Sequence, residues 1–347
     1  MRPLLNLMLV LILASPALAA DGVLEINATC AVQTGCFAGD TPGYPVSVTQ
    51  PGSYRLTSNL VQPDAATSVI LATANDVSID LGGFEISGPF LCPGNPANCL
   101  AAGNSYAVDA NGVSGASVTN GAVRGTARGI FLGDHCVVRD VRVVETTNNG
   151  IFVGAGCAIS RVVVARNGNH GVSLTQGTVT VTDSAAYDNE GSGFSFGLNA
   201  TITGSSARRN GGNGILGNAG TQVSNCVASD NTGSGISLNI AGAVTSSNSY
   251  SNTGSGISAL AGSVVRFNSA YGNSDRGIVL GAGSQAIGNS IRFNIGLGLT
   301  LGDLSGYREN VLTANNGGAE IQVGAALVSD TIFNLGSNVC GTDTACP

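Results

Sequence analysis

The stretch Asn231-Thr-Gly-Ser-Gly-Ile236 recurs as Asn252-Thr-Gly-Ser-Gly-Ile257, 21 residues further along the chain. The same spacing, with one step of 22, can be followed outward from this pair. It gives a column of asparagines: Asn167, Asn189, Asn210, Asn231, Asn252, Asn273, Asn294 and Asn315. Four residues later it gives a column of glycines: Gly171, Gly193, Gly214, Gly235, Gly256, Gly277 and Gly298. A period kept this long indicates one supersecondary unit stacked on itself.

Apolar residues also occupy fixed places within each repeat. Eight residues before the asparagine they form one column: Val138, Ile159, Val181, Ile202, Val223, Val244 and Val265. Five residues after it they form another: Ile151, Val172, Phe194, Ile215, Ile236, Ile257, Ile278 and Leu299. Polar residues alternate with these positions, which is typical of short strands with one buried face. We therefore predict three short strands in each repeat.

Three strands per turn, stacked in parallel, predict an all-β chain that forms a right-handed parallel β-helix of about a dozen coils. The asparagines have a physical role in this fold. A stacked amide can donate and accept hydrogen bonds at once, so a ladder of asparagines can join the corner of one coil to the next. We attribute the glycine column to backbone conformation, because glycine allows the chain to turn into the following strand.

Other solenoids fit the repeat less well. Leucine-rich repeats have a similar length, but they require leucine columns before the asparagine. Left-handed hexapeptide coils require a period that is a multiple of six, and calcium-binding nonapeptide repeats require a periodic aspartate. Neither feature is present in this sequence.

The ends of the chain depart from the repeat. Residues 1–20 contain Arg2, a short apolar stretch and Ala17-Leu18-Ala19, which together predict a cleaved export signal. We expect an N-terminal cap with a local disulfide over residues 21–45, the β-helix over 46–335 and a C-terminal cap over 336–347. A proline-containing segment, 88–104, should protrude as a loop. The mature chain has no predicted membrane-spanning segment, so a periplasmic, secreted or cell-surface protein of a bacterium is expected.

The composition narrows the possible partners. The chain has 51 glycines, no tryptophan and 10% charged residues, which suits short strands joined by tight corners. The net charge is −7, which argues against nucleic acid and against anionic lipid as partners.

Nine cysteines fall into two groups. Three close pairs are predicted to be local disulfides in an oxidising compartment: Cys30 with Cys36, Cys92 with Cys99, and Cys340 with Cys346. Cys136, Cys157 and Cys226 lie inside repeats, where we expect them to face the interior as small hydrophobic residues. An odd total leaves at least one free thiol, for which burial is the expected fate.

Charged residues also form columns, and their signs alternate. One column comprises Arg124, Glu145, Arg166, Asp188, Arg209 and Asp230, and a shorter one comprises Asp140, Arg161 and Asp183. Opposite charges on adjacent strands attract each other, so we interpret both columns as structural. Neither column supplies the neighbouring acids that a glycosidase or a calcium site requires. No metal or cofactor is predicted.

Two groups of residues are candidates for function. Asp134, His135 and Arg139 could supply a general base and a guanidinium group for a uronate, although a solvated corner is the interpretation that we favour. The second group is a single outward column: Tyr187, Arg208, Ser229, Tyr250, Tyr271 and Arg292. Its aromatic rings and guanidinium groups could bind sugars, and the alternative is an aromatic stack that supports the sheet.

Two kinds of segment carry a resemblance to a known family. They are the repeats Asn231-Thr-Gly-Ser-Gly-Ile236 and Asn252-Thr-Gly-Ser-Gly-Ile257, and the segments Pro51-Gly-Ser-Tyr-Arg-Leu-Thr-Ser-Asn-Leu60 and Val77-Ser-Ile-Asp-Leu-Gly-Gly-Phe84. These segments resemble secreted right-handed β-helix proteins of the pectate-lyase-like superfamily. The resemblance covers roughly residues 46–335. It implies the fold but not one activity, because that superfamily contains lyases, hydrolases, epimerases, adhesins and tailspikes. Three hypotheses follow: binding of an extracellular or cell-envelope polysaccharide along the solenoid side, lyase or epimerase activity on a uronate-containing polymer, and a structural or adhesion role without catalysis.

Overall fold

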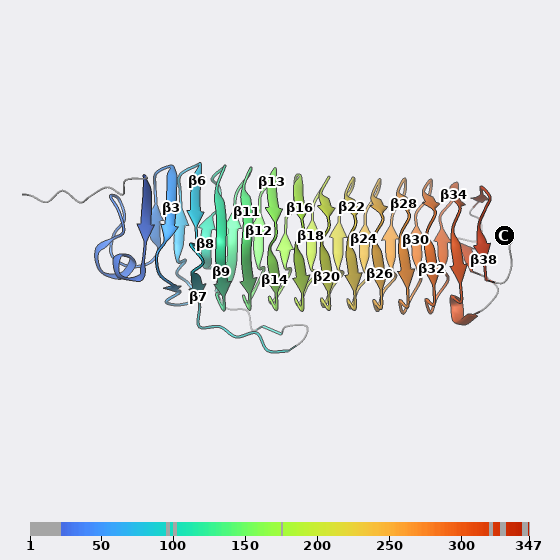
Figure 1. The fold of residues 1–347 in the computed structure, drawn as a ribbon, viewed down its shortest axis with the longest axis horizontal. Helices are drawn as coiled ribbons and strands as arrows, with labels where there is room; N and C mark the ends of the chain where they lie inside the picture. The colour runs from blue at the N-terminus through green and yellow to red at the C-terminus, as the bar shows by residue number, and fades with distance from the viewer. Residues whose placement is uncertain are drawn as a thin grey trace, which may run out of the picture.

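The computed structural model describes residues 22–94, 98–99, 103–174, 176–318, 322–326, 331–341 and 346. These residues form a right-handed parallel β-helix of about 13 turns, with almost no helix, as the sequence predicted. Figure 1 shows the strands stacked along the long axis of a rod, with the ends of the chain at opposite ends. The predicted export signal lies outside the described residues. No described helix is both long enough and apolar enough to cross a membrane.

One side of the rod is a 13-stranded parallel sheet, which we call sheet 1. Its strands are β2 (Val46–Val48), β5 (Ile70–Ala72), β8 (Tyr106–Ala110), β10 (Arg128–Leu132), β12 (Ile151–Val153), β15 (Val172–Ser173), β18 (Phe194–Phe196), β21 (Ile215–Gly217), β24 (Ile236–Leu238), β27 (Ile257–Ala259), β30 (Ile278–Leu280), β33 (Leu299–Leu301) and β36 (Val323–Ala325).

The other two sides, sheet 2 and sheet 3, share the long strands β9 and β11 and so form one 25-stranded sheet. Sheet 2 contains β1 (Val23–Ile26), β3 (Gly52–Leu56), β6 (Val77–Asp80), β9 (Ser117–Arg124), β11 (Val137–Val144), β13 (Cys157–Ser160), β16 (Val179–Thr182), β19 (Thr201–Thr203), β22 (Gln222–Ser224), β25 (Ala243–Thr245), β28 (Val264–Arg266), β31 (Gln285–Ile287), β34 (Ser305–Arg308) and β37 (Ile332–Asn334).

Sheet 3 continues from the shared strands and contains β4 (Leu60–Val61), β7 (Glu85–Ser87), β14 (Val163–Ala165), β17 (Ala185–Tyr187), β20 (Ser206–Arg208), β23 (Val227–Ser229), β26 (Asn248–Tyr250), β29 (Ser269–Tyr271), β32 (Ser290–Arg292), β35 (Val311–Thr313) and β38 (Val339–Cys340). A π-helix, η1 (Cys30–Thr34), and a 3-10 helix, η2 (Asn316–Gly318), lie near the two ends.

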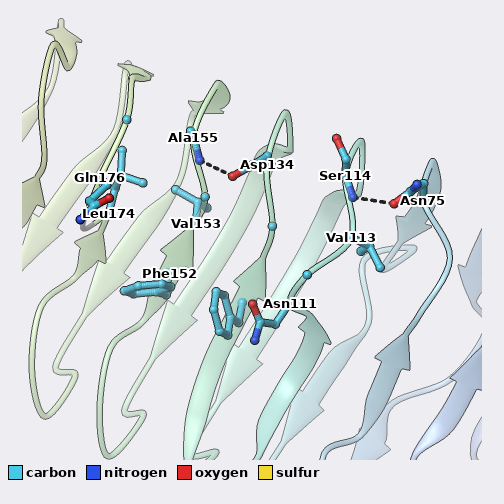
Figure 2. A pocket seen from close by; sticks show the side chains of 15 residues that line it. Asn75, Asn111, Val113, Ser114, Asp134, Phe152, Val153, Ala155, Leu174 and Gln176 are labelled. Atoms are coloured by element: carbon cyan, nitrogen blue, oxygen red, sulfur yellow. Dashed lines mark hydrogen bonds between the residues drawn. The ribbon is translucent and has the colours of Figure 1, made fainter.

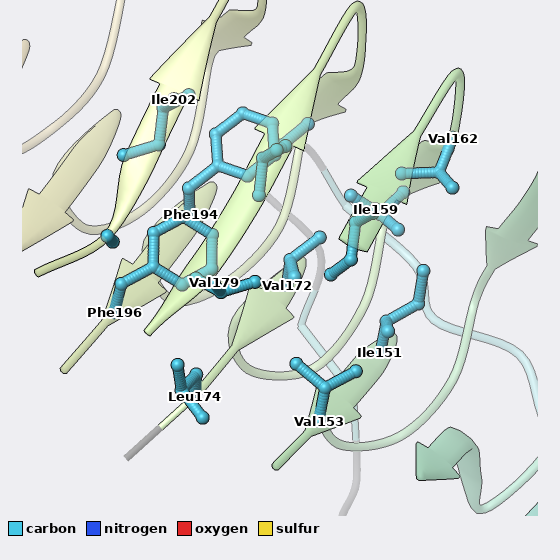
Figure 3. Packing of buried hydrophobic residues seen from close by; sticks show 14 of the residues in the cluster. Ile151, Val153, Ile159, Val162, Val172, Leu174, Val179, Phe194, Phe196 and Ile202 are labelled. Atoms are coloured by element: carbon cyan, nitrogen blue, oxygen red, sulfur yellow. The ribbon is translucent and has the colours of Figure 1, made fainter. Parts of the chain in front are cut away.

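The core lies inside the rod and is filled by the predicted apolar columns. Ile151 of sheet 1 and Ile159 of sheet 2 are both buried, and so are their counterparts one coil later, Val172 and Val181. Figure 3 shows the side chains of Ile151, Ile159 and Val172 converging between the sheets. Each coil therefore buries its apolar side chains against its neighbours, as expected for a stacked repeat.

The asparagine ladder is confirmed. From Asn167 to Asn315, each side chain donates through Nδ2 to the Oδ1 atom of the asparagine one coil later, at 2.8–2.9 Å. The backbone N–H of each asparagine donates to the same Oδ1 atom, as from Asn231 to Asn252 at 3.0 Å. Gln322 replaces the asparagine at the C-terminal end and accepts from Asn315 at 2.9 Å. The corner between sheets 3 and 1 is thus paired along most of the rod.

A second ladder, which the sequence analysis missed, lies at the corner between sheets 2 and 3. It begins with hydroxyl groups, since Ser184 N donates to Ser205 Oγ at 3.2 Å. It continues through asparagines, with Asn268 Nδ2 donating to Asn289 Oδ1 at 3.1 Å and Asn289 Nδ2 donating to Asn310 Oδ1 at 2.9 Å. The change from serine to asparagine hides this column in a search for one residue type.

Our explanation of the glycine column was wrong. Gly214 and its counterparts do not have the positive φ angles that favour glycine. The positive φ falls instead on the residue before each ladder asparagine, such as Arg209 at 51° and Asp230 at 57°. A Cβ atom on Gly214 would lie 2.7 Å from Asn231 Nδ2 and 2.6 Å from the carbonyl oxygen of Gly235. Glycine is required there because the ladder of the next coil occupies the space.

The three predicted disulfides are present, namely Cys30–Cys36, Cys92–Cys99 and Cys340–Cys346. A fourth bond corrects the prediction that Cys136 and Cys157 are separate small hydrophobic residues. These two cysteines are buried as expected, but they are joined to each other because the stacking places their Cα atoms 4.4 Å apart on adjacent coils. Cys226 is the free, buried cysteine, and burial raises the pKa of its thiol to about 11.

The alternating charges form ion pairs in four of the seven neighbouring pairs of the two columns. Glu145 pairs with Arg124 at 3.0 Å and with Arg166 at 3.3 Å, and Arg209 pairs with Asp188 at 2.7 Å. In the shorter column, Arg161 pairs with Asp140 at 2.7 Å. These side chains link successive coils, which supports their structural interpretation.

Candidate functional site

One row of side chains on the outside of sheet 1 changes character along the rod. The row has one residue per strand, aligned by strand register: Ser47, Leu71, Asp109, Phe131, Phe152, Ser173, Ser195, Leu216, Ser237, Ser258, Val279, Thr300 and Gly324. We call it the outer row. Most of its members are small or hydroxylated, so the two adjacent phenylalanines on β10 and β12 stand out.

The phenylalanines belong to a cluster of three aromatic rings, which we call the aromatic cluster. The ring centroids of Phe131 and Phe152 are 4.7 Å apart, with the rings nearly perpendicular. The ring of Tyr106 lies 5.3 Å from Phe131, and the guanidinium carbon of Arg128 lies 5.4 Å from the centre of the Tyr106 ring. All three rings are partly exposed. The cluster therefore offers an aromatic surface on three consecutive strands.

A hollow of about 640 Å³ lies beside the cluster, at the C-terminal ends of the strands of sheet 1 (Figure 2). Phe131, Phe152 and Leu174 form part of its apolar lining. Its polar lining comprises Asn75, Asn111, Ser114, Asp134 and Gln176. The one repeat of 22 residues has its extra residue between Ser173 and Val179, in the turn that borders this hollow.

A smaller hollow, of about 210 Å³, lies on the other side of the cluster and is lined by Tyr106, Arg128, Asn148, Asn149 and the two phenylalanines, with Ile130. The guanidinium group of Arg128 donates to Tyr106 Oη at 2.7 Å and to Asn104 Oδ1 at 2.6 Å. Both acceptors are neutral. The two hollows share Phe131 and Phe152, which lie between them, and we call the two hollows together with these rings the groove.

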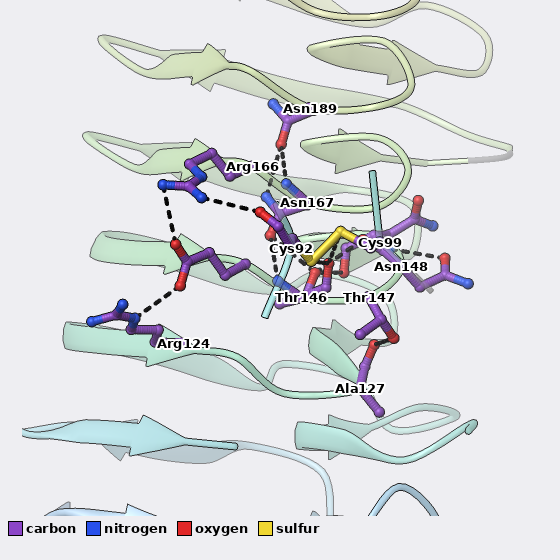
Figure 4. The surroundings of a disulfide bond; sticks show 12 residues. Cys92, Cys99, Arg124, Ala127, Thr146, Thr147, Asn148, Arg166, Asn167 and Asn189 are labelled. Carbon is purple, nitrogen blue, oxygen red and sulfur yellow. Dashed lines mark hydrogen bonds and ion pairs between the residues drawn. A yellow bond between two sulfur atoms is a disulfide. The ribbon is translucent and has the colours of Figure 1, made fainter. Parts of the chain in front are cut away.

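The disulfide loop packs against the corner that leads to this smaller hollow (Figure 4). Cys92 Sγ lies 3.3 Å from the carbonyl oxygen of Thr146, and Arg166 Nη2 donates to the carbonyl oxygen of Cys92 at 3.1 Å. Asn148, which lines the hollow, is only two residues from Thr146. The loop thus supports one wall of the groove.

Asp109 is the acidic residue of the outer row, one strand away from Phe131. Burial raises the pKa of its carboxyl group, and the hydrogen bond that it accepts from the backbone N–H of Asn111, at 3.2 Å, offsets part of this effect. The sequence analysis did not select Asp109.

The first predicted group of site residues does not converge on one point. Asp134 lines the large hollow, but its Oδ1 accepts from the backbone N–H of Ala155 at 2.7 Å. His135 Nδ1 lies 3.1 Å from Ser114 Oγ, and Arg139 is 3.5 Å from Asp140. The three side chains therefore have three separate partners.

The second predicted group does form one column on sheet 3, with Tyr187 beside Arg208 and Tyr250 beside Tyr271. The rings of Tyr250 and Tyr271 are stacked, with centroids 4.9 Å apart and planes 8° apart. The guanidinium carbon of Arg292 lies 5.3 Å from the centre of the Tyr271 ring. The Tyr271 ring therefore has a protein group on each side, and the Tyr250 ring has one on the side that faces Tyr271.

The sequence analysis missed the aromatic cluster although a signal was present. Phe131 and Phe152 are 21 residues apart, and each follows an apolar core residue, Ile130 or Ile151. In an alternating strand, the residue after a core position faces outward. Two outward phenylalanines one repeat apart can therefore be recognised in the sequence, but the sequence analysis selected charged and tyrosine-containing columns instead.

His170 belongs to a column of polar side chains at the edge of the groove. Its backbone N–H donates to Asn149 Oδ1 at 3.1 Å, and its Nδ1 atom accepts from the backbone N–H of Ser192 at 2.9 Å. Burial lowers the pKa of this imidazole below its ordinary value of 6.5. Burial therefore favours the neutral imidazole, whose unprotonated Nδ1 atom accepts the hydrogen bond from Ser192.

We expect this histidine to make the protein less stable in mild acid. Because the folded pKa is below the unfolded pKa, the unfolded chain binds the proton first, and stability decreases as the pH falls from 6.5 toward the folded value. Thermal unfolding of the wild type and of His170→Asn between pH 7.5 and 5.5 would test this. Asparagine supplies an acceptor that does not titrate, so the variant should lose less stability in acid. Parallel pH curves for both proteins would contradict the assignment.

The comparisons with known proteins agree with the fold. A family model described as "Right handed beta helix region" matches residues 149–295. The A-module of the mannuronan C-5 epimerase AlgE4 from Azotobacter vinelandii is 16% identical, with a TM-score of 0.61, over 91% of this chain and 97% of that one. The AlgE6 A-module from the same organism is also 16% identical, with a TM-score of 0.60, over 90% and 93% of the two chains. No curated protein matches the sequence. At these identities, the solved structures establish a shared architecture only.

Proposed function

We propose that this β-helix binds a polysaccharide chain in the groove on sheet 1, with the sugars stacked on the aromatic cluster, and that it does so without catalysis. The observation that carries the proposal is the placement of three partly exposed rings, Tyr106, Phe131 and Phe152, between two hollows. Elsewhere in the outer row, small and hydroxylated side chains predominate.

The chemistry of the groove suits a carbohydrate. A sugar ring has an apolar C–H face that packs on aromatic rings, and hydroxyl groups that need polar partners at the edges. Asn111 and Gln176 supply such partners on one side of the cluster, and Asn148 supplies one on the other. The two epimerase modules with the same architecture are named for activity on mannuronan, a polysaccharide, which supports the class of ligand.

Binding is favoured over catalysis because the described groove lacks a converging set of reactive groups. Asp134 is the one charged side chain among the described residues that line the large hollow. Among all the residues that the structure describes, no three histidine, cysteine or acidic side chains are placed to hold a metal ion. A lyase or epimerase needs a base beside the reacting carbon and a positive group for the carboxylate. Asp134, His135 and Arg139 do not provide this arrangement.

We further propose that the protein acts outside the cytoplasm, in the periplasm or beyond. Four disulfide bonds support this location, because such bonds persist in oxidising compartments. The signal-like sequence of residues 1–20 supports it independently.

The double variant Phe131→Ala/Phe152→Ala should bind its polysaccharide about 30- to 100-fold more weakly than the wild type, because two stacking surfaces are removed. Affinity electrophoresis through gels containing single polysaccharides would identify the ligand, and titration calorimetry would measure the loss. Val279→Ser, in the same outer row but six strands beyond Phe152, is the matched control and should bind normally.

Other results would favour the competing hypotheses. Loss of binding in Tyr250→Ala/Tyr271→Ala, but not in the phenylalanine variant, would move the site to sheet 3. An ultraviolet-absorbing unsaturated product, or a changed uronate composition, would show catalysis. Failure to bind any polysaccharide would favour a purely structural role.

A further inference from the structure

A second break in the outer row lies three strands beyond the aromatic cluster. Leu216 of β21 is aligned with Ser195 on one side and Ser237 on the other. Beside it is a separate hollow of about 330 Å³, lined by Phe196, Leu216, Gly217, Asn218, Ser237, Leu238, Asn239, Ser258 and Leu260. The outer row has two other aliphatic members, Leu71 and Val279, but neither of them lines any of the three hollows.

The hollow lies at the C-terminal edge of the strands, where the chain turns out of sheet 1. Leu216 lines it from the outer face of β21, and Asn218, Asn239 and Leu260 line it from the turns that follow three neighbouring strands. The hollow continues the line of the large hollow, whose lining includes the equivalent strand-end residues Val153 and Leu174.

The two sites are on the same face and at the same edge of sheet 1. Phe152 and Leu216 are three strand spacings apart in the outer row, which corresponds to about 14 Å along the rod. The row residues between them are Ser173 and Ser195. Both are small, so no bulky member of the row separates the hollows. A single sugar ring cannot reach both sites, whereas an extended chain parallel to the long axis can.

The lining of this hollow contains no charged residue. Its accessible apolar side chains are Leu216 and Leu260, and its rim carries amides and hydroxyls. Asn239 Nδ2 donates to Asn218 Oδ1 at 2.9 Å, which leaves a second amide hydrogen on Asn239 to donate outward. These groups match the C–H face and the hydroxyls of a sugar ring, and they make no demand for charge on the ligand.

We propose that this hollow is a second subsite for the same polysaccharide chain, which lies along the rod from the aromatic cluster to Leu216. The proposal rests on the function proposed above and adds the direction and minimum reach of the ligand. The second subsite recognises an uncharged sugar face, so its share of the affinity does not depend on salt.

The test compares chain lengths with Leu216→Ser, which gives the outer row the residue found on both neighbouring strands. The probes are the polysaccharide identified by electrophoresis and short oligosaccharides cut from it that span only the aromatic cluster. We expect Leu216→Ser to bind the polymer about tenfold more weakly in both low and high salt, and to bind the short oligosaccharides as the wild type does. Val279→Ser, in the same row beyond the hollow, should bind both probes normally.

A second variant, Ser237→Gln, fills the hollow from its rim and should weaken polymer binding to a similar degree. The subsite is disproved if the polymer and the short oligosaccharides bind the wild type equally and neither variant changes this. In that case the aromatic cluster still stands as the binding site, provided that Phe131→Ala/Phe152→Ala abolishes binding. If no polysaccharide binds the wild type, both proposals fail.

Discussion

Replacement of Asn231 by leucine should destabilise the rod by about 4 kcal/mol, because it breaks the ladder in the middle. The side chain of Asn231 donates to the carbonyl oxygen of Ala207 at 3.2 Å, and its Oδ1 accepts both the backbone and side-chain N–H groups of Asn210 at 3.0 and 2.9 Å. Leucine has a similar size, but it satisfies none of these buried groups. Denaturant unfolding followed by circular dichroism would measure the loss.

Ser258→Ala is the control for this variant, because Ser258 lies in the outer row and is partly exposed. It should change the free energy of unfolding by less than about 0.5 kcal/mol. Stacked repeats can unfold in parts. The unfolding of both variants should therefore be followed over the whole denaturant titration and by more than one spectroscopic probe. Similar effects of the two substitutions would mean that the asparagine column does not stabilise the corner.

The variant Gly214→Ala should cost about 3 kcal/mol, although it adds a single methyl group. That group would lie 2.6 Å from the carbonyl oxygen of Gly235 and 2.7 Å from Asn231 Nδ2, so the backbone of the next coil would have to move. The change would also separate the ladder amides at this point. Thermal and denaturant unfolding of the purified variant would detect the loss.

A matched glycine separates crowding from conformational strain. Gly272 has a positive φ of 62°, but a Cβ atom there would meet only Ser251 Oγ, at 4.0 Å. The same position one coil earlier is Ser251 itself, with a φ of 54°. Gly272→Ser should therefore cost no more than about 1 kcal/mol. If Gly214→Ala cost no more than Gly272→Ser, crowding by the next coil would not be the reason for glycine at position 214.

The sequence predicted the architecture because a stacked repeat brings residues of fixed spacing into contact. Asn231 and Asn252, or Tyr250 and Tyr271, are neighbours in space for the same reason that they are one period apart in the chain. The charged columns followed from the same rule. The cause of the glycine column could not be predicted from this rule. Gly214 is crowded by the ladder of the next coil, and a pattern of residue types does not show how much space surrounds a backbone atom.

The Cys136–Cys157 bond was missed for a related reason. The spacing of 21 residues predicts that both cysteines lie in one buried column. It also implies that adjacent members of that column lie within bonding distance, which is the point that the prediction left out. The groove was missed because it depends on turns of unequal shape, such as the one at Gln176, and on two outward phenylalanines that other coils lack. Periodic patterns predict what is common to all coils, whereas the proposed site consists of exceptions.

The ladders also govern how such a protein can change its length over evolutionary time. A duplicated segment of one full repeat would place every new asparagine opposite an existing one and extend the rod by about 4.8 Å. A segment that lacked one residue inside a strand, rather than in a turn such as the one at Gln176, would move the following core side chains toward the outside. The rod can therefore lengthen only by whole turns, and its relatives should differ in length by integral numbers of turns.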